Sequence, residues 1–328
     1  MRAIVYSEYG PPEVLHLSEL AKPTPKDDEV LIRIRAASVN PIDWHFMRGT
    51  PYAMRLASGL RRPKVTRLGI DVAGRVEAAG KNVARFQAGD DVFGTCKGAF
   101  AEFACASENA LVLKPENVTF EQAAAVPVAA LSALQGLRDK GQIRPGQKVL
   151  INGASGGVGT FAVQLANVFG AEVTGVCSSR NAGLVRSIGA NHVVDYTQED
   201  FTKTGRRYDL ILDTIGNHSL SDCRRALAPK GTFVLVGSSE GGRWLGPVKG
   251  MLKVAALSRF VSQRLLPFFA RLNKDDLIAI QELLGAGKVT PVIDRSYSLS
   301  DVPQAIRYLE EGHARGKIVI SMEDSGEG

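Results

Sequence analysis

Three glycines, Gly153, Gly156 and Gly159, follow an apolar stretch at 148–152 and precede a helix-like run that includes Phe161. Glycines at this spacing let the backbone turn sharply and come close to a bound ligand. The helix that follows would offer unpaired N–H groups and a positive dipole end to an anion. The pattern therefore predicts a nucleotide site whose pyrophosphate contacts this loop, and an ordinary strand-to-helix turn is the alternative.

The residues after the next predicted strand, 172–177, bear on which nucleotide is bound. An NAD site usually carries Asp or Glu here, which holds the ribose 2′-hydroxyl. This chain has Ser178, Ser179 and Arg180 instead, and hydroxyl and guanidinium groups favour a 2′-phosphate. The sequence therefore favours NADPH over NADH. The alternative is that the serines only cap the next helix and that Arg180 is a solvated surface charge.

The length and composition are those of a globular protein large enough for two domains. The chain has 328 residues, of which 45% are hydrophobic and 23% are charged. Its scattered cysteines match neither a disulfide framework nor a zinc-binding spacing; they are Cys96, Cys105, Cys177 and Cys223. No apolar run reaches the roughly 20 residues that cross a bilayer, and the first residues indicate a strand rather than a signal peptide. We therefore expect a cytoplasmic protein.

The net charge of +6 is concentrated in two segments that contain no acidic residue. Segment 48–68 has six basic residues, and segment 241–274 has seven. Such clusters suit anionic partners, either phosphate or an anionic membrane surface, and two solvated loops are the alternative. We expect no nucleic-acid partner.

Apolar residues recur every three or four positions across 248–269, and basic residues fall mainly off that stripe. The spacing predicts an amphipathic basic helix that ends near Pro267. Such a helix could pack against the protein body or a second subunit, close over the substrate as a lid, or rest on a membrane. We expect it to lie with the basic loop 55–67 near one mouth of an interdomain cleft, where a lipophilic acceptor would enter.

The two halves of the chain differ in their secondary-structure pattern. The first 120 residues predict strands at 2–6, 30–38, 69–79 and 100–105. Thr119 and Gln122 form a capping-box pattern that opens a helix over 123–133. Strands then alternate with helices, which is typical of a doubly wound parallel sheet and predicts an α/β protein. These later strands are expected at 148–152, 172–177, 192–195, 208–213 and 231–236.

Together these motifs resemble the medium-chain dehydrogenase/reductase superfamily, and within it the zinc-free quinone oxidoreductase branch. The resemblance spans essentially the whole chain and rests on the glycine loop and on residues 38–43, 68–74, 89–94, 98–102 and 316–320. It implies a β-rich GroES-like catalytic domain at 1–122 and a Rossmann NADP-binding domain at 123–270. Residues 271–328 would return to the catalytic domain. We also expect a homodimer.

Residue types at two positions argue against the catalytic zinc of the alcohol dehydrogenases, to which the chain is similar in outline. A ligand Cys there corresponds to Asn40, and a Gly-His-Glu motif corresponds to Gly69, Ile70 and Asp71. Zinc takes thiolate, imidazole or carboxylate ligands, which Asn and Ile do not supply. The four-cysteine lobe that holds a second zinc is also missing. We therefore expect no metal site and an acceptor polarised by hydrogen-bond donors, water or the cofactor ribose.

The resemblance implies that Asn40 and Asp43 lie on the wall of the active site. It also implies that Tyr52 faces the cleft and donates its O–H to the acceptor oxygen; a half-buried packing role is the alternative. We expect Asp71 to hold a turn. His45 is a candidate proton donor because imidazole titrates near neutral pH.

On the cofactor side, the resemblance implies backbone N–H contacts to the pyrophosphate and a polar pocket for the 2′-phosphate. Arg180 stands where the branch often has Lys, which preserves the charge, and Tyr196 matches a tyrosine of the branch. Two later strands end at 213 and 236, where the nicotinamide ribose and ring are expected. The expected cofactor-binding residues are Ser155, Gly156, Gly157, Val158, Ser178, Arg180, Tyr196, Thr214, Gly237 and Lys317.

We therefore predict a zinc-independent, NADPH-dependent oxidoreductase that transfers hydride to a quinone or an α,β-unsaturated carbonyl. Such acceptors carry their own electron sink, so a metal Lewis acid is less needed than for an alcohol. Two alternatives stay open: zinc-free alcohol–ketone chemistry, and an NADPH-binding scaffold or sensor with little turnover. The glycine loop does not separate an enzyme from a binder, because both need it.

Overall fold

The structure, a computed structural model, describes residues 1–236 and 261–322. It divides into two compact units. Unit 1 comprises Met1–Val128 and Leu272–Gly328, and unit 2 comprises Ala129–Arg271. The domain prediction from the sequence places its divisions after residues 122 and 270. Unit 1 is therefore built from both ends of the chain, and unit 2 is a single continuous stretch.

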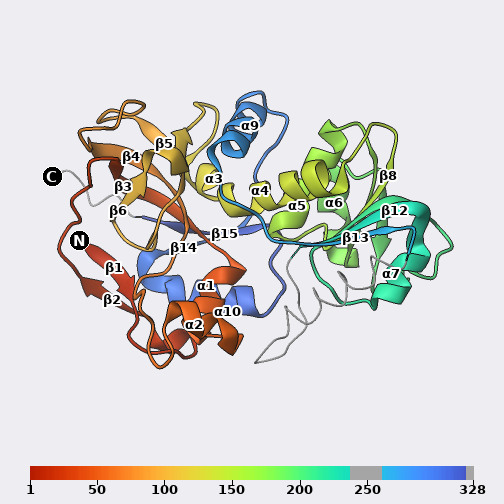
Figure 1. Ribbon diagram of the computed structural model, residues 1–328, viewed down its shortest axis with the longest axis horizontal. Helices are drawn as coiled ribbons and strands as arrows, with labels where there is room; N and C mark the ends of the chain where they lie inside the picture. The colour runs from red at the N-terminus through yellow and green to blue at the C-terminus, as the bar shows by residue number, and fades with distance from the viewer. Residues whose placement is uncertain (237–260, 323–328) are drawn as a thin grey trace. The chain divides into compact units, whose positions relative to one another are not determined.

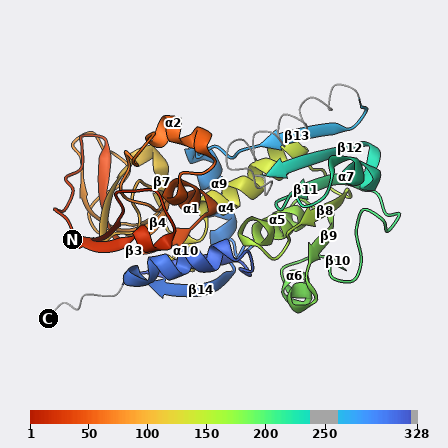
Figure 2. The ribbon, with the colours of Figure 1, turned by 90° about the horizontal axis from the view of Figure 1, so that it is seen from below.

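Unit 2 is built on a six-stranded parallel sheet in the order β10-β9-β8-β11-β12-β13 (Figure 2). Its strands are β8 (Lys148–Asn152), β9 (Glu172–Cys177), β10 (His192–Asp195), β11 (Tyr208–Asp213), β12 (Leu227–Val236) and β13 (Arg264–Phe268). The strand order reverses between β8 and β11, and doubly wound sheets bind their ligands at the carboxyl ends of strands at such a point. The predicted parallel α/β sheet is confirmed.

The central strands of this sheet are short, apolar and completely buried, as expected where helices cover both faces of a parallel sheet. Val149, Leu150 and Ile151 of β8 are fully buried, as are the corresponding residues of β11. The helices of this unit contact the sheet: α5 (Gly157–Val168) packs on β8 and β9, α6 (Ala182–Ser187) on β9 and β10, and α7 (Leu220–Ala226) on β12. The sheet therefore gives the loops at its carboxyl edge a rigid base.

Unit 1 contains a seven-stranded sheet in the order β14-β15-β3-β4-β5-β7, with β6 also paired to β3. The chain's last strand, β15, lies antiparallel to β3, so residues near the C-terminus complete a sheet that begins near the N-terminus (Figure 1). A separate hairpin joins β1 and β2. The strands are β1 (Arg2–Val5), β2 (His16–Glu19), β3 (Glu29–Val39), β4 (Asp71–Ala79), β5 (Asp91–Thr95), β6 (Phe103–Ser107), β7 (Leu111–Leu113), β14 (Ile293–Ser298) and β15 (Lys317–Ser321).

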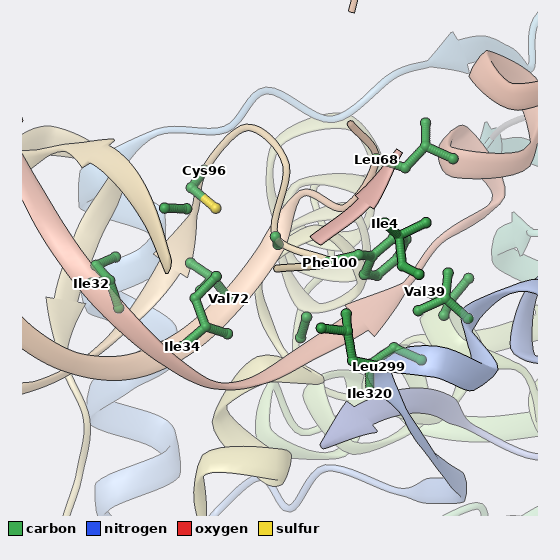
Figure 3. Close-up of a cluster of buried hydrophobic side chains, with 14 of the residues drawn as sticks. Ile4, Ile32, Ile34, Val39, Leu68, Val72, Cys96, Phe100, Leu299 and Ile320 are labelled. Carbon is green, nitrogen blue, oxygen red and sulfur yellow. The ribbon is translucent and has the colours of Figure 1, made fainter. Parts of the chain in front are cut away.

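One hydrophobic core holds the two parts of unit 1 together. Figure 3 shows Leu299 and Ile320, from the C-terminal part, in one cluster with Ile4, Val39 and Phe100 from the N-terminal part. All five side chains are at most 7% exposed. Burial of apolar surface contributes about 25 cal/mol per Å², so this core stabilises the closure of the sheet by the chain's end.

The predicted helix at 123–133 is wrong in one respect, because the structure divides it. The capping box is confirmed, with Thr119 and Gln122 bonded reciprocally, and α3 runs only over Phe120–Ala124. α4 then begins at Pro127. Proline lacks an N–H and disfavours helical geometry in the residue before it, so the helix is interrupted there. α4 ends at Gln135 and lies mostly in unit 2. The other described α-helices of unit 1 are α1 (Pro41–Arg48), α2 (Arg55–Ser58), α9 (Lys274–Gly285) and α10 (Val302–Glu310).

The amphipathic helix predicted for 248–269 is wrong over its last part. Residues 264–268 form β13, which pairs in parallel with β12, and residues 248–260 lie outside the described residues. A short apolar run fits a strand as well as a helix, and the neighbouring strand decides between them. Pro267 is tolerated because β13 is an edge strand. Within 1–236 and 261–322, no helix is long and apolar enough to cross a membrane.

Candidate functional site

The glycine loop connects β8 to α5 at the carboxyl edge of the unit 2 sheet, and two of its glycines are required by the protein itself. Gly153 has a φ of +84°, and a Cβ there would lie 2.4 Å from Thr214 Oγ1. A Cβ on Gly159 would lie 2.0 Å from the Gly153 carbonyl oxygen. Both positions exclude a side chain because the turn and the helix pack too closely.

Gly156, the N-cap of α5, differs from its two neighbours. Its φ of −83° and ψ of 176° suit any residue, and a Cβ there would meet only the Gly153 carbonyl oxygen, at 3.4 Å. The protein's own packing therefore does not require a glycine. A bound anion would require one. The first N–H groups of a helix have no intrahelical acceptor, and a side chain at residue 156 would stand between these groups and the anion. The loop thus fits a pyrophosphate, which the N–H groups of Ser155, Gly157 and Val158 would contact, since the Gly156 N–H already donates to the Gly153 carbonyl at 3.0 Å.

A small polar hub ties the ends of β8 and β11 together. Asn152 Nδ2 donates to Asp213 Oδ1 at 2.8 Å and to Asn217 Oδ1 at 3.0 Å. Asp213 Oδ1 also accepts two backbone N–H groups of the loop that follows. Thr214, expected to contact cofactor, donates its hydroxyl to the Asn152 carbonyl at 2.8 Å and so positions the loop. Asn152 and Asn217 were missed from the sequence, because nothing local marks a cross-strand bond.

Asn181 is a second residue that the sequence did not single out. Its Nδ2 donates to Ser155 Oγ in the glycine loop at 3.0 Å, and its side chain is only 6% exposed. Its Oδ1 is buried and has no hydrogen-bond partner among the described residues. A buried acceptor without a donor costs about 1–3 kcal/mol, so the bond to Ser155 holds Asn181 in place at the expense of this oxygen. Its place one residue after Arg180 is the signal that could have found it.

The residues predicted to recognise the 2′-phosphate lie at the carboxyl ends of β9 and β10. Ser178 follows β9 directly and is half-buried, whereas Arg180 and Tyr196 are exposed, Tyr196 by 57%. Within the described parts of the chain, the Arg180 guanidinium has no hydrogen-bond or ion-pair partner. A cation without a partner beside a nucleotide loop is free to bind an anion.

One carboxylate, that of Asp195, lies near these residues. It belongs to β10, whereas the acidic residue of an NAD site is expected at the end of β9. Asp195 is paired in register with Cys177. It accepts hydrogen bonds from the Ser179 hydroxyl and from the N–H and hydroxyl of Thr197. The bond from Ser179 is the main reason that the pKa of Asp195 is lowered. This carboxylate is therefore already occupied by protein donors.

In unit 1, Asn40, one of the residues predicted for catalysis, belongs to a buried network centred on Asp71. Its Oδ2 accepts from Ser38 Oγ at 2.8 Å and from Asn40 Nδ2 at 2.9 Å, and Lys317 Nζ lies 3.5 Å away. Its Oδ1 accepts from the Val128 N–H at 3.0 Å. Asp71 is completely buried, so its charge is balanced within the protein.

Lys317 is the cation of this network. Its Nζ donates to Asn40 Oδ1 at 2.6 Å and to the Val39 carbonyl at 3.3 Å. Burial lowers the pKa of Lys317, and Asp71 opposes that shift. The Asn40 amide is thus occupied at both ends, by Lys317 and by Asp71. These bonds stabilise unit 1 from within; the active-site role of Asn40 and the cofactor contact of Lys317 stay predictions.

Asp43 has a structural role, and its place on the active-site wall stays a prediction. Its Oδ2 accepts from the Asn40 N–H at 2.8 Å, and its Oδ1 accepts from the Gly69 N–H at 3.1 Å. It therefore caps α1 and fixes the loop before β4. Burial raises the pKa of Asp43 to about 7, and the side chain is 1% exposed.

Tyr52 and His45 lie on either side of the turn after α1. Tyr52 is half-buried, and the Arg55 guanidinium lies 4.7 Å from its ring centroid. His45 Nδ1 lies 2.8 Å from the Thr50 carbonyl oxygen, to which it donates. Burial lowers the pKa of His45, and the bond to Thr50 holds the turn. Gly237, the remaining predicted cofactor residue, lies outside the described residues.

Two family models match the chain. The alcohol dehydrogenase GroES-like domain matches residues 26–116, and a model described as zinc-binding dehydrogenase matches residues 188–320. Within the residues that the structure describes, no group of three or more His, Cys, Asp or Glu side chains is placed to hold a metal ion.

Individual proteins match over nearly the whole chain. The chloroplastic quinone-oxidoreductase homolog of Spinacia oleracea is 37% identical over 98% of this chain and 98% of its own length. The chloroplastic NADPH-dependent alkenal/one oxidoreductase of Arabidopsis thaliana is 34% identical over 98% of this chain and 79% of its own. The structure of the quinone oxidoreductase from Coxiella burnetii superposes with a TM-score of 0.87 and 31% identity, over 98% of this chain and 99% of that one.

Proposed function

Because the chain belongs to the medium-chain dehydrogenase/reductase superfamily, in its zinc-independent quinone oxidoreductase-like branch, we propose that it uses NADPH to reduce quinones or α,β-unsaturated carbonyls. The observation that carries this proposal is the glycine loop, where Gly156 is left open for a ligand. The names of the spinach and Arabidopsis relatives support the acceptor class. The protein is an oxidoreductase that uses a nicotinamide cofactor.

Different groups of the described residues would bind different parts of this cofactor. Backbone N–H groups at the start of α5 would hold the pyrophosphate, and Asn181 would position Ser155 of the same loop. Ser178, Arg180 and Tyr196 would surround a 2′-phosphate. The unpartnered Arg180 and the already occupied Asp195 support NADPH over NADH. When bound, the cofactor supplies the hydride.

The acceptor oxygen needs a donor as negative charge develops on it. We propose that the Tyr52 hydroxyl is this donor, because it lies on the turn after α1 and is only half-buried. In Tyr52→Phe we expect kcat to fall about tenfold or more with NADPH affinity unchanged. Tyr308→Phe, which removes a hydroxyl bonded to Asp294, is the control. An unchanged kcat in Tyr52→Phe would assign this ring to packing.

The proposed activity is tested by measuring NADPH oxidation by the purified full chain with a quinone, an enone and a simple ketone, each also with NADH. We expect kcat/KM with the quinone or the enone to exceed that with the ketone by at least about tenfold, which is about 1.4 kcal/mol. A preference for the ketone would favour alcohol–ketone chemistry. Tight NADPH binding without turnover of any acceptor would favour a binding protein.

A further inference from the structure

The loop 55–67 of unit 1 exposes an unusual number of large aliphatic side chains. Leu56 is 75% exposed, Leu60 is 68% exposed and Val65 is 51% exposed. Leu56 and Leu60 are the most exposed large hydrophobic side chains in the described part of the chain. Single exposed apolar residues are ordinary, but a group of them on one loop marks an interaction surface.

The same loop carries cations that no acid neutralises. Arg61, Arg62 and Lys64 are exposed, and segment 48–68 contains no acidic residue. Within residues 1–236 and 261–322, none of these three side chains has an ion-pair partner. The surface therefore combines protruding apolar groups with unbalanced positive charge. Neither cofactor binding at the glycine loop nor hydride transfer requires exposed apolar side chains next to unbalanced positive charge.

The backbone of the loop is held in place by hydrogen bonds. Tyr9 donates its hydroxyl to the Gly59 carbonyl at 2.6 Å, and the Lys64 N–H donates to the Ser58 carbonyl at 2.8 Å. Gly59 has a φ of +119°, and a Cβ there would lie 2.1 Å from the Arg62 carbonyl oxygen. The turn is therefore specified by the sequence. The leucines project from a backbone that is already ordered, so binding does not have to order it.

We propose that loop 55–67 docks the protein on a lipid bilayer that contains anionic headgroups. Leu56 and Leu60 would enter the boundary between headgroups and acyl chains, while Arg61, Arg62 and Lys64 would contact lipid phosphates. A second copy of the chain is the poorer occupant, because a two-fold interface would set the same cations against each other. The proposal rests on this loop alone and is independent of the proposed function.

The test is flotation of the full chain with vesicles of phosphatidylcholine and with vesicles that also contain phosphatidylglycerol, at low and high salt. We expect binding to the anionic vesicles at low salt and release at high salt. The triple variant Arg61→Gln, Arg62→Gln, Lys64→Gln should lower partitioning about 100-fold, since each basic residue contributes about fivefold. The double variant Leu56→Ser, Leu60→Ser should lower it at least about tenfold on the same vesicles.

Matched controls carry equal changes elsewhere on the surface. The variant Lys230→Gln, Lys288→Gln, Arg315→Gln loses the same charge from three other exposed residues, and the double variant Leu17→Ser, Leu113→Ser removes two leucines that are 42% and 47% exposed. Both should bind like the parent, and melting curves verify that all variants fold. No binding of the parent to anionic vesicles overturns the proposal, as does an equal loss in the control triple variant. Dissociation of a dimer by the leucine changes, measured by light scattering, also overturns it and assigns the surface to a second copy.

Discussion

Charged and amide side chains in this protein fall into two groups that differ in what they contact. Asn40, Asp43, Asp71 and Lys317 are each at most 3% exposed, and they bond to one another or to backbone groups. A buried charge is costly unless it is paired, so these residues stabilise unit 1. Arg180 is exposed and has no partner among the described residues. Its charge is available to a ligand.

Removal of the Arg180 charge should change which cofactor is preferred. We expect Arg180→Ala to weaken NADPH binding about tenfold or more, since it removes a charge-assisted bond to the 2′-phosphate. NADH binding should be unaffected. Calorimetric titration with both cofactors measures this, with Arg186→Ala on α6 as an exposed control. An equal loss for both cofactors would show that Arg180 does not read the 2′-phosphate.

Asp43 should make stability depend on pH in a defined direction. Its pKa is about 7 in the folded state, against an ordinary value of 3.8. The stability that protonated Asp43 supplies is therefore present in full below about pH 4 and is lost as the pH rises through about 7. Relative to Asp43→Asn, the parent's free energy of unfolding should fall by about 1–3 kcal/mol between about pH 5 and pH 8. Urea unfolding at both pH values measures it, and a constant difference would contradict the shift.

The glycines in the connection from β8 to α5 have two different roles. Two of them allow the fold, and the third leaves room for a ligand. Gly153 and Gly159 are required by close contacts within the protein, whereas Gly156 is open. The loop itself is held by Asn152 and Thr214. The close contacts of Gly153 and Gly159 therefore fix the path of the backbone into α5, where an anion would bind.

Alanine at these glycines should separate stability from binding. Gly159→Ala places a Cβ against the Gly153 carbonyl and should destabilise the fold by about 1–3 kcal/mol. Gly156→Ala should change stability by no more than about 1 kcal/mol, yet weaken NADPH binding at least about tenfold, because the methyl group blocks the ligand. Denaturant unfolding and cofactor titration give the two readouts. Normal NADPH affinity in Gly156→Ala would count against the proposed pyrophosphate position.

At the scale of the whole molecule, the two ends of the chain depend on each other. β15 pairs with β3, and Lys317 bonds to Asn40, which lies 277 residues earlier. The same strands contribute to the hydrophobic core that includes Val39 and Ile320. Unit 1 therefore requires the end of the chain for both its core and its buried charge balance.

The buried pair can be tested as a unit. Lys317→Met leaves Asp71 charged and without its cation, which should cost about 3–5 kcal/mol of stability. The double variant Asp71→Asn, Lys317→Met removes both charges and should recover at least half of that loss. Lys288→Met, at an exposed position, is expected to change stability by less than about 0.5 kcal/mol. Additive losses in the double variant would show that the two charges do not interact.

The amino-acid sequence by itself determined the features that depend on neighbouring residues. The strands predicted at 172–177, 192–195 and 208–213 match β9, β10 and β11, because short buried strands between turns are apolar runs with clear ends. The glycine loop and the capping box at Thr119 were visible for the same reason. The family could be named from motifs of this kind.

Only the tertiary structure decided what the polar residues contact. Whether Asn40 faces a ligand or Lys317 depends on β15 lying beside β3. Likewise, β12 made residues 264–268 a strand where the periodicity predicted a helix, and the unpaired Asn181 Oδ1 is defined by its surroundings alone. Local sequence specifies which residues favour a strand, a turn or a cap. The pairing of buried polar groups depends on contacts between residues far apart in the chain, and these exist only once the topology is formed.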